Sequence, residues 1–96
     1  MTELDIRCSR VSTGADWTCH VTIAVEGGPT TEHRVRVAPA DLERLDPGAR
    51  DPHLLVDASF RFLLAREPAT SILRSFDLME IARYFAEFER EIRRGT

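Results

Sequence analysis

The first third of the chain alternates between apolar and polar side chains, and this alternation constrains the fold more than any other feature. It occurs in three stretches, at about residues 3–10, 17–26 and 32–37. A period of two places successive side chains on opposite faces of a β-strand, so each stretch predicts a strand with one buried face. The short segments Thr13-Gly14 and Gly27-Gly28-Pro29 lie between the stretches and favour hairpin turns. The pattern therefore predicts a three-stranded antiparallel meander.

The turn at Thr13-Gly14 also predicts how the first two strands pair. If these two residues form the loop, residues whose numbers sum to 27 lie opposite each other. The opposed apolar pairs are then Leu4–Ile23, Ile6–Val21 and Cys8–Cys19. The spacing of the two cysteines matches no zinc site. We expect them to be thiols rather than a disulfide, because disulfides are rare in the cytoplasm.

The rest of the chain predicts helices. Their expected ranges are about 39–45, 52–66 and 78–93. Pro39 and Pro52 suit the first turn of a helix, and Asp51 suits an N-cap. Asp77 and Glu80 form a variant of the capping box at the start of the last helix.

These elements predict the fold class. A sheet with one apolar face must be covered, and the helices are the only segments that can cover it. We therefore expect a single α+β domain over residues 1–96, in which about three helices pack on one face of the meander as two layers. Phe60 and Phe62 lie about 200° apart around the second helix. We expect one of them to reach the surface.

Two segments near the C-terminus resemble a family of small uncharacterised bacterial proteins. Phe60–Glu67 reads FRFLLARE, and Thr70–Phe85 reads TSILRSFDLMEIARYF. The resemblance covers about the last 40 residues well and extends to the strands only in general style. It implies an α+β fold and no known activity, so it assigns no functional residue. The family pattern has proline where this chain has Ala86, and whether the last helix is continuous stays open.

Composition and charge exclude several classes of protein. Hydrophobic residues make up 43% and charged residues 30%, as in ordinary folded proteins. No apolar run approaches the roughly 18 residues of a membrane-spanning helix. The N-terminus lacks the basic and apolar regions of a signal peptide, so we expect a cytoplasmic protein. The net charge of −3 gives no general attraction to nucleic acid or to an anionic membrane.

No pattern of residues points to a reaction. His20, His33 and His53 are the usual candidates for a general base, but the sequence places no nucleophile or carboxylate beside them. No acidic cluster resembles a metal site, and no glycine-rich phosphate-binding motif is present. We therefore assign no catalytic residue, cofactor or metal, and the sequence leans against an enzyme.

The function that the sequence favours is protein–protein association. A small domain buries little core and often gains stability by association, so we expect a non-catalytic accessory protein that binds a partner or forms a homodimer. Trp17 and Phe60 are the candidate aromatic contacts. The alternative is a small regulator that binds nucleic acid through Arg34 and Arg36 on the outer face of the sheet. A small enzyme with an unrecognised site is the third hypothesis.

Overall fold

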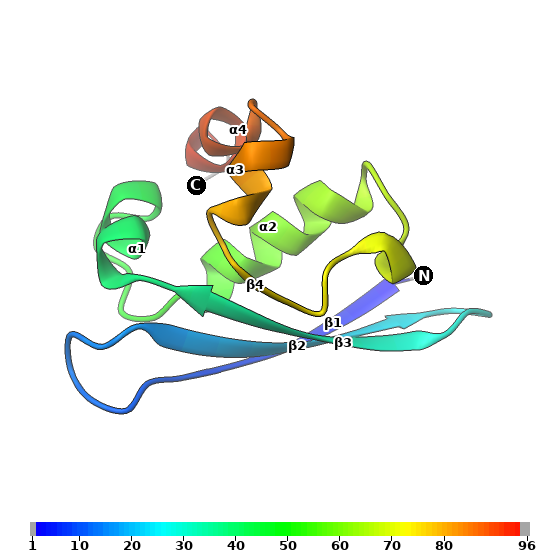
Figure 1. Ribbon diagram of the computed structural model, residues 1–96, viewed down its shortest axis with the longest axis horizontal. Helices are drawn as coiled ribbons and strands as arrows, with labels where there is room; N and C mark the ends of the chain where they lie inside the picture. The colour runs from blue at the N-terminus through cyan, green and yellow to red at the C-terminus, as the bar shows by residue number, and fades with distance from the viewer. Residues whose placement is uncertain (1, 95–96) are drawn as a thin grey trace.

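The computed structural model describes residues 2–94, which form one mixed four-stranded sheet with helices on one of its faces (Figure 1). The elements along the chain are β1 (Thr2–Ser9), β2 (Trp17–Val25), β3 (Thr30–Val37), α1 (Pro39–Leu45), α2 (His53–Leu64), the 3-10 helix η1 (Ala69–Ser71), β4 (Ser75–Asp77), α3 (Glu80–Tyr84) and α4 (Phe88–Arg94). The strands lie in the order β1-β2-β3-β4. The fold is therefore α+β, with one strand and one helix more than the sequence predicted.

The predicted pairing of the first two strands is confirmed. In the β1–β2 ladder the opposed pairs include Leu4–Ile23, Ile6–Val21 and Cys8–Cys19. The Ala15 N–H donates to the Ser12 carbonyl at 3.1 Å, so Thr13 and Gly14 form the centre of the turn. Gly14 has a φ of 89°, a conformation that glycine adopts without steric cost.

Cys8 and Cys19 form a disulfide, so the expectation of free thiols is wrong. Their Cα atoms are 4.0 Å apart, the close spacing of a non-hydrogen-bonded pair in an antiparallel ladder. Side chains at such a pair point to the same face and approach each other closely. The strand pairing itself therefore brings the two sulfur atoms within bonding range.

The fourth strand, β4, was not predicted. It runs parallel to β3, with Phe76 opposite Val35. Its three residues are too few for an alternating pattern to be visible in the sequence. Backbone hydrogen bonds hold it at both ends: Arg34 N–H donates to the Arg74 carbonyl at 2.7 Å, and Leu78 N–H donates to the Arg36 carbonyl at 2.9 Å.

The helix predicted over 78–93 is two shorter helices, α3 and α4. Phe85 adopts an extended conformation with φ −129° and ψ 98°, which ends α3. Phe88 N–H then donates to the Phe85 carbonyl at 3.0 Å and closes the turn into α4. The break therefore occurs without a proline at position 86. It directs α4 against α2, where the ring centroids of Phe88 and Phe62 are 5.2 Å apart.

Helix α2 is covered on two sides, and this corrects the expectation for its two phenylalanines. It begins at His53 and ends at Leu64, slightly inside the predicted range of 52–66. Phe60 packs toward the sheet, with ring centroids 5.6 Å from His33 and 6.0 Å from Phe76. Phe62 packs toward α4, and both phenylalanines are buried. Helix α2 therefore lies between the sheet and α4. The predicted two-layer arrangement has only one layer of helices on the sheet.

Helix α1 has the predicted bounds and is linked to the C-terminal helices by Arg44. The guanidinium of Arg44 donates to Asp41 at 2.8 Å and to Glu89 on α4, and it lies 3.6 Å from the sulfur of Met79. The hydrogen bond with Asp41, followed by the charge of Glu89, raises the pKa of Arg44 above its ordinary value. The ion pair between Arg44 and Glu89 therefore links α1 to α4.

Candidate binding groove

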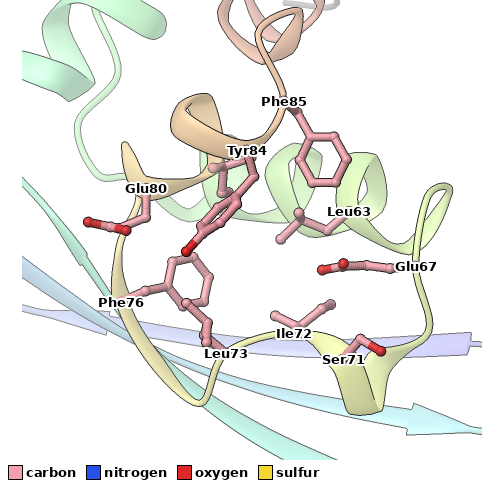
Figure 2. A pocket seen from close by; sticks show the side chains of 10 residues that line it. Leu63, Glu67, Ser71, Ile72, Leu73, Phe76, Glu80, Tyr84 and Phe85 are labelled. Carbon is pink, nitrogen blue, oxygen red and sulfur yellow. The ribbon is translucent and has the colours of Figure 1, made fainter.

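An apolar groove of about 470 Å³ lies beside the short strand β4 (Figure 2). The end of α2, η1, β4 and α3 all contribute to its walls. Leu63, Ile72 and Ile81 line it and are buried, and Phe76 and Phe85 are half-buried beside them. The interior of the groove is therefore formed by hydrocarbon and aromatic rings.

Two large apolar side chains on the rim are open to solvent. Leu73 is 51% exposed and Tyr84 is 71% exposed. Among residues 2–94, only Val11 and Leu54 are comparable exposed hydrophobics, and neither lines the groove. Exposed apolar surface around a concave apolar surface is typical of a binding site.

Two carboxylates lie at the groove, and they differ in their surroundings. Glu67 follows the end of α2 and directs its carboxylate into the groove between Leu63 and Ile72 (Figure 2). Glu80 lies at the other side of the groove and points away from it; its carboxylate accepts a hydrogen bond from Arg83 at 3.3 Å. Glu67 is therefore the charged group that an occupant of the groove would meet.

A buried histidine holds the strand side of the groove in place. His33 lies on β3 and is 4% exposed. Its Nδ1 lies 2.7 Å from the Leu73 carbonyl, which can only accept, so Nδ1 donates. In the neutral ring, Nε2 then accepts from the hydroxyl of Thr31 at 2.9 Å. Both ring nitrogens are satisfied, and His33 positions Leu73 rather than serving as an exposed base.

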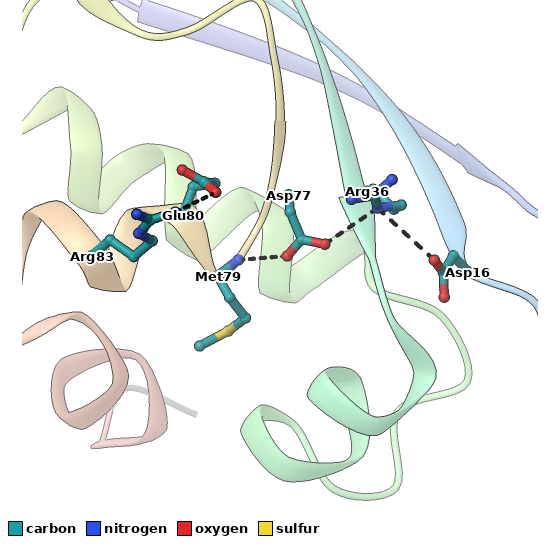
Figure 3. Close-up of polar contacts among 6 residues, drawn as sticks. All are labelled: Asp16, Arg36, Asp77, Met79, Glu80 and Arg83. Atoms are coloured by element: carbon teal, nitrogen blue, oxygen red, sulfur yellow. Dashed lines mark hydrogen bonds and ion pairs between the residues drawn. The ribbon is translucent and has the colours of Figure 1, made fainter.

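Asp77 organises the turn between β4 and α3 (Figure 3). One carboxylate oxygen accepts the Met79 N–H at 3.0 Å, and the other accepts the Arg36 Nε–H at 3.2 Å. Asp77 was predicted to cap a helix that starts at residue 78. It instead ends a strand and stabilises the turn that leads into α3 at Glu80.

The candidate residues from the sequence do not form one site. Arg34 is exposed on the outer sheet face, opposite His20. Arg36 lies on the same face but forms ion pairs with Asp77 at 3.2 Å and with Asp16 at 3.9 Å, so its charge is shared with two carboxylates (Figure 3).

The two aromatic candidates occupy different environments. Phe60 is fully buried, so its ring belongs to the core and has no surface to offer a partner. Trp17 is half-buried, and the Arg10 guanidinium covers its ring at 4.4 Å from the centroid.

His53, one of the three candidate bases, is exposed. Its backbone N–H donates to the carboxylate of Asp51, which was predicted to be a helix cap.

The groove residues Glu67, Leu73 and Tyr84 were not singled out by sequence reasoning. Tyr84 fits the apolar stripe of a helix, and that pattern predicts burial rather than exposure. Leu73 follows Ile72 directly, and two adjacent apolar residues do not show which of them is buried. The proline after Glu67 marks the end of a helix, but it does not show where the glutamate side chain points.

The described part of the chain offers no metal site and no membrane span. Within residues 2–94, no group of three or more histidine, cysteine or acidic residues is placed to hold a metal ion. No helix in this range has the length and apolar character needed to cross a membrane.

Comparison with family models, with curated proteins and with solved structures finds no match to this chain.

Proposed function

We propose that this chain is a non-catalytic binding module that holds an apolar side chain of a partner protein in the groove beside β4. The observation that carries the proposal is the exposure of Tyr84 and Leu73 on the rim of an apolar groove of about 470 Å³. Covering such surface is favourable by about 25 cal/mol for each Å² removed from water. An exposed tyrosine such as Tyr84 is also typical of protein interfaces, where the ring packs against the partner and the hydroxyl reaches water.

The charge at the groove indicates which partner sequence fits. Glu67 directs a carboxylate into the apolar interior, and none of the ion pairs within residues 2–94 involves it. A carboxylate that loses water on binding needs a hydrogen-bond donor or a cation. The partner segment should therefore carry a large apolar residue close to a lysine or an arginine.

A randomised peptide library displayed against the immobilised protein tests this proposal. Selected peptides are titrated into isotopically labelled protein, and their dissociation constants are measured by calorimetry. We expect enriched peptides to combine an apolar residue with a basic one and to shift the amide signals of residues 63–85. Tyr84→Ala should weaken binding by about 1 kcal/mol or more, as at other interface hot spots.

Two further variants make the test specific. Glu67→Gln removes the charge but keeps the shape, and it should weaken only those peptides that contain the basic residue. Val11→Ser changes an exposed apolar residue in the β1–β2 loop, far from the groove lining, and should leave affinity unchanged. Peptides that bind Tyr84→Ala as tightly as the original chain, or shift signals elsewhere, would contradict the proposal.

A further inference from the structure

The longest free backbone edge of the sheet is β1. This strand has eight residues and pairs only with β2. Among residues 2–94, no backbone hydrogen bond from a turn, loop or helix end reaches it. An edge of this length offers a row of unpaired N–H and C=O groups to another strand.

The disulfide pair shows which backbone groups face outward. Cys8 and Cys19 lie opposite each other with a Cα separation of 4.0 Å, which marks a non-hydrogen-bonded pair. The backbone groups of Cys8 therefore point away from β2. Because the two kinds of pair alternate along a ladder, those of Leu4 and Ile6 point outward as well. The free edge thus presents the backbone of residues whose side chains lie on the core face.

The charges on β1 select one way for two copies to pair. Asp5 and Arg7 lie on the outer face, are exposed, and approach each other at 3.6 Å within the strand. If two copies of β1 pair antiparallel with Ile6 on the two-fold axis, Asp5 of each copy lies opposite Arg7 of the other. The hydrogen-bonded pairs are then Ile6–Ile6 and Leu4–Cys8, in agreement with the outward backbone groups.

Neighbouring registers are opposed by charge. An axis through Asp5 places Glu3 opposite Arg7, but it also places the two aspartates opposite each other. An axis through Arg7 places two arginines opposite each other. An axis through Leu4 places Glu3 opposite Asp5. Like charges directly opposite destabilise a strand pair, whereas opposite charges stabilise it. Of these four registers, the one centred on Ile6 is the one that pairs unlike charges without also placing like charges opposite each other.

We propose that two copies of this chain associate through β1, with Ile6 on the axis, and join their four-stranded sheets into one continuous sheet. This interaction surface is separate from the groove, which lies beside β4 at the opposite edge of the sheet order. The dimer would therefore leave both grooves free. The inference does not depend on the binding function proposed above.

Sedimentation velocity and native mass spectrometry, over a protein concentration series, test the proposal with a charge exchange. Asp5→Arg alone and Arg7→Asp alone each place like charges opposite each other twice in the dimer. Each variant should therefore raise the dimer dissociation constant by about tenfold or more. An equimolar mixture of the two variants restores the opposite-charge pairs and should form a heterodimer.

The matched control is Arg34→Asp. Arg34 and Arg7 both lie opposite His20 on the same face of the sheet, but only Arg7 is on the free edge. The control should dimerise like the original chain, and circular dichroism should show that all variants stay folded. The proposal is overturned if the original chain is monomeric at millimolar concentration. It is equally overturned if Arg34→Asp dissociates the dimer as strongly as Arg7→Asp, or if the mixture fails to associate.

Discussion

Replacing Arg66 with methionine tests what holds the end of α2 against α4. The Arg66 guanidinium lies 3.6 Å from the centroid of the Phe62 ring, and its Nη1 donates to the Phe62 carbonyl at 3.0 Å. Nη2 donates to the two carboxylate oxygens of Glu91 at 3.2 and 3.1 Å, and Nε lies 3.5 Å from Glu87. The side chain is only 26% exposed, so these contacts are partly shielded from water.

The expected loss of stability follows from these contacts. The cation–π contact contributes about 0.5–2 kcal/mol, and the hydrogen bond to the carbonyl contributes about 0.5–1.5 kcal/mol. The ion pairs with Glu87 and Glu91 add about 0.2–1 kcal/mol each and are weakened by salt. Methionine keeps the packing of the aliphatic stem. The variant should therefore lose about 2 kcal/mol of unfolding free energy, or about 8–16 °C in Tm.

Urea denaturation followed by circular dichroism measures this loss. Arg66→Lys keeps the charge but not the planar group that stacks on Phe62, so it should lose about half as much. The control is Arg61→Met, because Arg61 lies on the exposed face of α2 and pairs only with Asp57 among the described residues. The control should change stability by less than about 0.5 kcal/mol. If Arg66→Met were as stable as Arg61→Met, the reasoning about the α2–α4 contact would be refuted.

Two further changes test local features of the fold. Asp77→Ala removes the acceptor for the Met79 N–H and the partner of Arg36, and it should lower the unfolding free energy by about 0.5–2 kcal/mol. An unchanged denaturation midpoint would contradict the role of Asp77. Replacing both Cys8 and Cys19 with alanine should lower it by about 2–3 kcal/mol, because the disulfide closes a loop with a sequence separation of 11. In the presence of a reductant, the original chain should have a urea denaturation midpoint close to that of the double variant. A midpoint that does not change with reductant would argue against the disulfide.

The sequence alone determined the antiparallel hairpins and the register of β1 and β2. This was possible because the period of two and the Thr13-Gly14 turn are local, and a shift of one residue would move every apolar side chain to the wrong face. The bounds of α1 were predicted for a similar reason, since Pro39 suits the first turn of a helix.

Only the tertiary structure decided the remaining features. A strand of three residues such as β4 shows no periodicity, and it forms because β3 offers a free edge beside it. The apolar spacing in residues 78–93 is compatible with a continuous helix, and the break at Phe85 serves the packing of Phe88 against α2. The burial of both Phe60 and Phe62 requires neighbours on two sides of one helix. The groove combines side chains from four separate elements, so its shape depends on distances that no local pattern encodes.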